Sequence, residues 1–220
     1  MNTSIEITDI NYNTNEVIFK YFNKEYKIPS NEFPLGDNKR CLYNENTKNL
    51  KNKKIEDIYN KQVIRQAQCF DNSNGLYNDL INERVCNRHN LKIMAGWLFV
   101  GFNLPVYHCF LLYKDVYVLD LTINTNTKEI NDVLNSGISI DDKRRKVVEI
   151  INGMSNDKNS DKTTFGKMTE EKFFIGSEFK TVEDAVELYK ELIDENPNHI
   201  TIVETNNRGL SKTQQMIKEK

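Results

Sequence analysis

Residues 91–120 form the most hydrophobic part of the chain, and they divide into three segments with the length of β-strands. β-branched and aromatic side chains dominate each segment, and short stretches that contain glycine, proline or charged residues separate them. Strands joined by such short connections are expected to pair as antiparallel neighbours. The predicted strands are residues 91–99, 106–112 and 116–121, with connections at 101–105 and 113–115.

Apolar side chains return every three or four residues between positions 66 and 84, which predicts a helix with one buried face. Cys69 lies near the start of this helix. The pair Asn74 and Gly75 weakens it, because glycine costs on the order of 1 kcal/mol relative to alanine inside a helix. A second amphipathic helix is predicted after Thr181, which can cap it and which two acidic residues follow in the first turn.

The remaining pattern predicts an α+β fold with an irregular N-terminal part. A hairpin is expected over residues 16–28, and residues 30–60 are polar and rich in Asn and Lys, which favours short helical turns on the surface. We expect three parts: an N-terminal hairpin with a surface-wrapping extension at 1–59, the main domain at 60–205, and a polar tail at 206–220. Further elements are predicted at 143–151 (helix), 171–179 (strand) and 199–204 (strand).

The composition is that of an ordinary globular domain and excludes several classes of protein. The chain has 220 residues, of which 28% are charged and 38% hydrophobic, enough for one domain with an adequate core. The formal net charge is -2, with basic and acidic residues interspersed, so no nucleic-acid partner is expected. No apolar stretch is long enough to span a membrane and no export leader is visible, so we expect a cytoplasmic protein without membrane association.

The chain's four cysteines are too sparse for a disulfide framework, so we expect free thiols. A thiol attacks as the thiolate, which a helix N-terminus and a neighbouring histidine both favour. Cys69 has the first feature. Of three histidines, only His108 lies inside a strong predicted strand, beside a strand that ends at Asp120. Cys69, His108 and Asp120 are therefore the candidates for nucleophile, base and orienting carboxylate.

The proposed pairing of His108 with Asp120 depends on the turn between their strands. A three-residue loop at 113–115 places His108 directly opposite Asp120, with both side chains on one face of the sheet. A two-residue turn at 114–115 would instead place His108 opposite Leu121 and direct Asp120 to the other face. One residue of register therefore decides whether the triad can form.

Four short runs together resemble the small papain-like proteins of bacteria and their phages. These proteins have a Cys-aromatic-x-Asn helix start, a strand with Gly-Trp or Gly-Tyr, a strand with the histidine, and a hairpin partner that ends in Asp-x-Thr. Transglutaminase-like folds have the same order of Cys, His and Asp. The resemblance covers residues 60–125 and implies a papain-like α+β fold with the active-site helix packed on an antiparallel sheet. The matching runs are Gln68-Cys-Phe-Asp-Asn-Ser73, Met94-Ala-Gly-Trp97, Pro105-Val-Tyr-His108 and Leu119-Asp-Leu-Thr122.

The chain departs from this family's pattern at two positions. Cys109 follows the histidine where the family usually has a small residue, which puts a second thiol beside the base. Ala95 precedes Gly-Trp where an acidic residue is common. Any role of that carboxylate is absent here, which weakens an inference about substrate.

Supporting roles can be assigned around the nucleophile. The backbone N–H of Cys69 and one side-chain donor are expected to hold the oxyanion, a contribution of about 3 kcal/mol in comparable sites. Gln62, Gln66 and Gln68 all lie close upstream, and we favour Gln66 as that donor. Asn72, one helical turn after the thiol, matches the family's asparagine and is expected to brace the site. Trp97 is a candidate both for the core and for substrate contact.

A zinc site is the main alternative chemistry for these residues, and strand geometry argues against it. Cys86 and His89 have a usual ligand spacing, and His108 and Cys109 could supply two more ligands. Neighbours in a strand point to opposite faces, however, so His108 and Cys109 are poorly placed for one ion. We therefore expect no metal and no cofactor.

These features favour a cysteine-dependent hydrolase or acyltransferase acting on an amide, isopeptide or ester bond, with a peptide or protein as the candidate substrate. Water as acceptor gives peptidase, amidase or deamidase activity, and an amine gives transglutamination. The alternative is a non-catalytic binding module with the same fold, in which Cys69 is a buried core thiol. The oligomeric state stays open.

Overall fold

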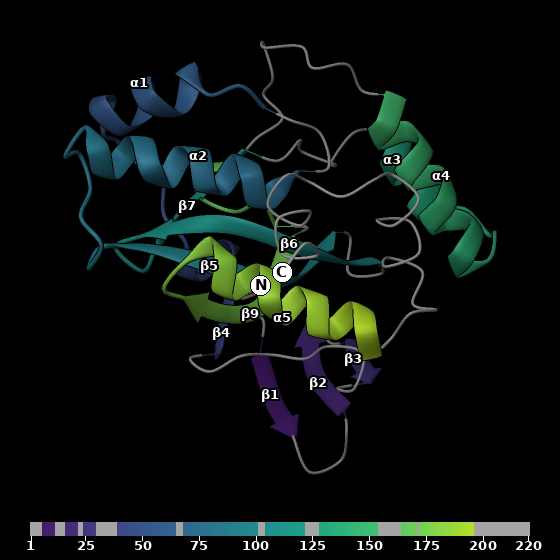
Figure 1. The fold of residues 1–220 in the computed structure, drawn as a ribbon. Helices are drawn as coiled ribbons and strands as arrows, with labels where there is room; N and C mark the ends of the chain where they lie inside the picture. Colours follow the sequence, from purple (N-terminus) through teal and green to yellow (C-terminus); the bar gives the residue numbers. More distant parts are fainter. Residues whose placement is uncertain are drawn as a thin grey trace.

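A computed structural model contains two antiparallel β-sheets and five α-helices in the described part of the chain (Figure 1). The smaller sheet consists of three short strands in the order β1-β2-β3, and it includes the predicted N-terminal hairpin. These strands are β1 (Glu6–Asn11), β2 (Glu16–Tyr21) and β3 (Lys24–Pro29). The structure describes residues 6–11, 16–21, 24–29, 39–64, 68–100, 104–121, 128–153, 164–170 and 172–195.

The larger sheet has six strands in the order β4-β9-β5-β6-β7-β8, and every neighbouring pair is antiparallel. The three predicted central strands and the strand predicted at 171–179 are all present. Edge strands β4 and β8 were not predicted, because each is short and lies in a polar stretch. The strands are β4 (Lys39–Tyr43), β5 (Leu91–Val100), β6 (Leu104–Tyr113), β7 (Tyr117–Asp120), β8 (Thr164–Gly166) and β9 (Lys172–Phe179).

Helices α1, α2 and α5 pack their apolar sides against one face of this sheet. This arrangement confirms the predicted α+β fold. The pair Asn74-Gly75 does not interrupt α2, because Leu76 and Leu80 beyond it are fully buried. Helices α3 and α4 pack on each other through Ile130 and Val147. The helices are α1 (Lys53–Lys61), α2 (Cys69–Asn82), α3 (Lys128–Leu134), α4 (Ile140–Gly153) and α5 (Val182–Glu195).

In the central strands of the six-stranded sheet, odd-numbered residues lie on one face and even-numbered residues on the other. On β6, Tyr107, Cys109 and Leu111 face the helices, whereas Phe110 and Leu112 belong to a second apolar cluster on the opposite face. Alternation of this kind is the period-two pattern of a strand. The even-numbered His108 and Asp120 are consequently expected on the face away from the helices.

Helix α1 is a complete element where only short helical turns were predicted. Asn52 accepts a hydrogen bond from the backbone N–H of Ile55 and caps the helix. Ile55, Ile58 and Tyr59, spaced by three and one, bury one side of α1 in the same core as α2. The division of the chain at residue 59 stays a prediction, but residues 39–61 supply β4 and α1 to the unit built on the larger sheet.

Three further predictions concern the helix at 143–151 and the C-terminal residues. The strand predicted at 199–204 and the tail at 206–220 lie outside the described residues. The helix predicted at 143–151 falls within α4. Among the helices of the described ranges, none combines the length and hydrophobicity needed to cross a membrane.

Candidate active site

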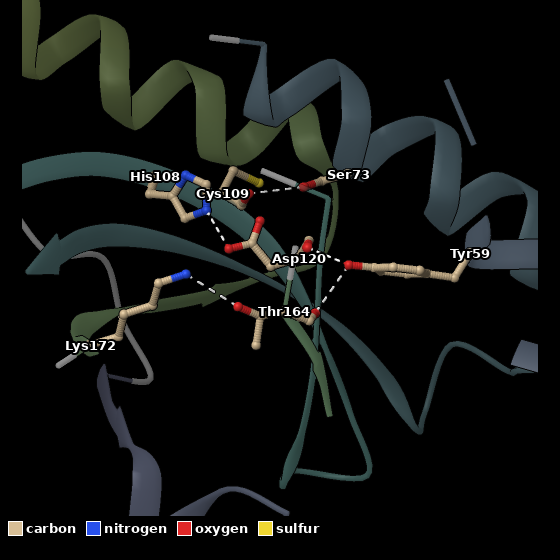
Figure 2. Close-up of polar contacts among 7 residues, drawn as sticks. All are labelled: Tyr59, Ser73, His108, Cys109, Asp120, Thr164 and Lys172. Carbon is tan, nitrogen blue, oxygen red and sulfur yellow. Dashed lines mark hydrogen bonds and ion pairs between the residues drawn. The ribbon is translucent and has the colours of Figure 1, made fainter. Parts of the chain in front are cut away.

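His108 and Asp120 form a buried pair on one face of the larger sheet (Figure 2). The His108 Nε2 atom lies 2.9 Å from the Asp120 Oδ2 atom, and the two residues are only 3% and 5% exposed. His108 comes from the middle of β6 and Asp120 is the last residue of β7. The carboxylate therefore fixes which ring nitrogen faces away from it, as the third residue of a triad does.

The register that brings this pair together differs from the predicted one. The hairpin pairs Tyr113 with Tyr117, so Asp120 is level with Phe110 and lies diagonally from His108 instead of directly opposite. The prediction of direct opposition was wrong, but a shift of two residues keeps both side chains on the same face.

Three residues, 114–116, cause the altered register. Lys114 and Asp115 have positive φ angles of 49° and 64° and make the turn, as the two-residue alternative supposed. Val116 lies outside the ladder: its N–H donates to the Tyr113 carbonyl across the turn, and its carbonyl accepts a hydrogen bond from the N–H of Lys48. Because of this extra residue, the Asp120 side chain lies on the same face as His108. A two-residue turn alone would direct it to the opposite face.

Cys69 is the first residue of α2 and is partly exposed. The carbonyl of Gln68 accepts the first helical hydrogen bond, from the N–H of Asn72, and the Gln68 side chain makes no capping bond. A thiol at this position lies where the helix dipole and the free backbone N–H groups favour negative charge. Its own N–H is a candidate oxyanion donor, because the first N–H groups of a helix have no partner within it.

The start of α2 lies against an open edge of β6, which explains how Cys69 reaches a histidine on the far face. The last β6–β7 pair is Leu111 with Leu119, so within the described residues β7 does not cover Cys109. The Ser73 hydroxyl instead donates to the Cys109 carbonyl at 3.0 Å (Figure 2). Ser73 is one turn from Cys69, so this bond holds the thiol-bearing helix beside the strand that carries the histidine.

The Cys69 thiol lies close enough to the His108 ring to raise its pKa. Because Asp120 occupies Nε2, the thiol is left with Nδ1. Burial of the ring lowers the pKa of His108, but the charge and hydrogen bond of Asp120, together with the Cys69 contact, overcome it and raise that pKa to about 10. The ring is therefore set to hold both protons at neutral pH, one toward each partner.

The other three cysteines have surroundings that disfavour the thiolate. Burial raises the pKa of Cys41 and Cys109, and that of Cys86 to about 11. Near neutral pH these thiols are protonated and poor nucleophiles. All four cysteines are free, as expected.

Of the residues predicted to support the nucleophile, the structure describes Gln68 and Asn72 but not Gln66. Gln66 lies outside the described residues, so its role as oxyanion donor stays a prediction. Gln68 is the helix cap residue directly before the thiol, and Asn72 is buried in the first turn of α2. Gln62 also lies upstream of Cys69. Its side chain donates to the carboxylate of Asp79, farther along α2, at 2.7 Å.

Trp97 lies in the core on the helix-covered face, at 1% exposure, with its ring edge-on to Tyr107 at 5.3 Å. The preceding residue, Gly96, pairs with His108 across the β5–β6 ladder. The core role of Trp97 is confirmed. Contact with a substrate would require the surrounding packing to open, and that role stays a prediction.

Sequence reasoning missed the residues that surround Asp120. The Tyr59 hydroxyl donates to the Asp120 carbonyl at 2.5 Å, and the buried Lys172 ammonium donates to the Thr164 hydroxyl at 3.3 Å (Figure 2). Thr164 is the ladder partner of Asp120. The spacing of apolar residues in α1 could have indicated that Tyr59 is buried, but its partner is 61 positions away and leaves no local signal.

Within the described ranges, no three His, Cys, Asp or Glu side chains gather in a way that could hold a metal ion. Comparison with known proteins adds no further constraint: the chain matches no protein family, no curated protein and no solved structure. The geometry of the site itself therefore carries the functional argument.

Proposed function

We propose that this protein is a papain-like cysteine hydrolase or acyltransferase in which Cys69 is the nucleophile, His108 the acid and base, and Asp120 the residue that orients His108. The observation that carries the proposal is the position of the His108 ring, which is hydrogen-bonded to Asp120 and lies close enough to the Cys69 thiol for that thiol to raise its pKa. The location of that thiol at the first residue of a helix supports the same assignment.

The first half of the reaction forms a thioester. In the reactive pair the second ring proton of His108 has come from Cys69, so the thiolate lies beside a protonated ring and attacks the carbonyl carbon of an amide, isopeptide or ester bond. We assign stabilisation of the oxyanion to the backbone N–H of Cys69, because Cys69 is the first residue of α2 and the first N–H groups of a helix have no partner within it. His108 then gives its proton to the departing nitrogen or oxygen as the bond to the carbonyl carbon breaks.

The second half transfers the acyl group to an acceptor. His108 removes a proton from water or from an amine, the acceptor attacks the thioester carbonyl, and Cys69 leaves as the thiolate beside the protonated ring. Water gives hydrolysis or deamidation and an amine gives transamidation, so the proposal covers both. A peptide or protein is the proposed substrate.

The alternative of a non-catalytic module has less support. A deeply buried Cys69, or an Asp120 on the face opposite His108, would favour it. Cys69 is partly exposed, and Asp120 bonds His108 directly.

An activated ester tests the proposed chemistry without knowledge of the natural substrate. The protein is mixed with p-nitrophenyl acetate, and both p-nitrophenol release and the mass of the acylated peptides are followed. We expect a burst of p-nitrophenol and an acetyl group on the Cys69 peptide, with both lost in Cys69→Ala. Acetylation spread evenly over the four cysteines, or none at Cys69, would overturn the proposal.

A further inference from the structure

The β6–β7 hairpin does not by itself fix the hydrogen bond between His108 and Asp120. The last pair in that ladder is Leu111 with Leu119, so Asp120 lies one residue beyond it and His108 lies three residues beyond it. The position of the Asp120 backbone therefore also depends on its contacts on the other side of β7.

Two contacts restrain Asp120 on this other side of β7. Asp120 pairs with Thr164 of β8, and the Tyr59 hydroxyl lies 2.5 Å from the Asp120 carbonyl oxygen and 3.2 Å from the Thr164 carbonyl oxygen. One hydroxyl proton serves both carbonyls, and the shorter contact identifies Asp120 as its main acceptor. Tyr59 therefore joins the last residue of β7 to the first residue of β8 (Figure 2).

Tyr59 is itself held rigidly. Its side chain is 5% exposed, and its ring packs edge-on against Phe165 with 5.0 Å between centroids. Ile55 and Ile58 anchor the same helix, α1, in the core. The hydroxyl thus has a fixed position relative to the sheet, which is what a side chain that positions a backbone carbonyl requires.

We infer that Tyr59 is a positioning residue of the active site, which holds the Asp120 backbone so that its carboxylate faces Nε2 of His108. Tyr59 acts on the site through the backbone carbonyls of Asp120 and its ladder partner Thr164. Its effect on catalysis rests on the proposed function, whereas its effect on His108 does not.

The variant Tyr59→Phe tests this inference because it keeps the ring packing and removes only the hydroxyl. Tyr113→Phe is the matched control, since Tyr113 is also a buried tyrosine of the same core, at the far end of β6. Two readouts are compared in folded protein: the pKa of His108 from NMR titration of its ring, and the rate of Cys69 alkylation by iodoacetamide.

We expect Tyr59→Phe to lower the pKa of His108 below the wild-type value and to slow Cys69 alkylation about tenfold, while Tyr113→Phe changes neither. A merely structural loss would lower the melting temperature without moving the His108 titration. Replacement of Tyr59 by 4-aminophenylalanine, which keeps an N–H donor, should give values between wild type and Tyr59→Phe. If Tyr59→Phe does not fold, this amino variant decides, since its weaker donor should still lower the pKa of His108.

The outcomes separate this inference from the proposed function. An unchanged His108 titration in a folded Tyr59 variant would overturn the positioning role, even if wild-type Cys69 is selectively reactive. If wild-type Cys69 shows no selective reactivity, the proposed function fails, and the titration alone still decides the role of Tyr59.

Discussion

His108 and Asp120 make a 2.9 Å hydrogen bond although they are not opposite each other in the β6–β7 ladder. The diagonal arrangement works because both are buried on the same face, where the carboxylate can reach Nε2 across one step of the ladder. The bond leaves Nδ1 for the Cys69 thiol. The chemistry of the site therefore depends on the charge and position of one carboxylate.

Asp120→Asn should lower the pKa of His108 from about 10 to below its ordinary value of about 6.5. Burial already lowers that pKa, and the variant removes the main opposing charge. NMR titration of the ring measures the shift directly. Acylation of Cys69 should slow by roughly a hundredfold or more, because the ring loses its orienting partner.

Asp115→Asn is the matched control for this change. Asp115 lies at the exposed turn of the same hairpin, where hydrogen bonds and charges of Lys92 and Arg40 lower its pKa. It makes none of the contacts of the site, so the His108 titration should stay at the wild-type position. A shift of equal size in both aspartate variants would mean that net charge, and not the His108–Asp120 pair, sets the pKa.

The raised pKa of His108 also predicts how stability depends on pH. Because the folded state binds this proton more tightly than the unfolded state, the pair stabilises the fold fully below about pH 6.5. This contribution is lost as the pH rises through the folded-state pKa of about 10. Urea unfolding of wild type and of His108→Gln should therefore show a difference that shrinks from pH 6 toward pH 10. A difference that grows over this range would contradict the assigned protonation.

Gly96→Ala should disrupt the sheet at the histidine. A Cβ atom at Gly96 would lie 2.3 Å from the Gly176 Cα atom and 2.5 Å from the Ile175 carbonyl oxygen, both backbone atoms of the neighbouring strand β9. Strands β5 and β9 would have to separate where Gly96 also pairs with His108. We expect a loss of about 3 kcal/mol or more in the free energy of unfolding, measured by urea denaturation.

Gly137→Ala is the control for that substitution, because a Cβ atom there meets nothing within 4 Å. Its free energy of unfolding should change by no more than about 1 kcal/mol. Equal effects at both positions would show that the close approach of β5 and β9 at Gly96 is not the constraint.

The sequence predicts the site well where the determinants are local. Apolar spacing locates α2 and so places Cys69 at a helix start, and strand composition locates β5, β6 and β9. The order of Cys69, His108 and Asp120 was sufficient to nominate the triad before any distance was known. These are features of single segments, which local propensity and periodicity determine.

Contacts between distant segments were beyond reach of the sequence. The N–H of Lys48 donates to the carbonyl of Val116, the residue that lies outside the ladder. The bond from Tyr59 to Asp120 comes from a helix in a stretch where only short helical turns were predicted. In both cases a residue from the N-terminal third contacts the hairpin, and neither contact leaves a pattern in its own segment.

Selective alkylation tests the central claim, activation of Cys69 by His108, most directly. Folded protein is treated with limiting iodoacetamide near neutral pH, and the modified cysteine is located by peptide mapping. We predict that Cys69 is alkylated first and that Cys41, Cys86 and Cys109 react only after denaturation, since burial raises the pKa of these three thiols. The Cys69 rate should also fall in His108→Gln. Reaction of Cys69 no faster than that of the other three, or only after denaturation, would contradict the account.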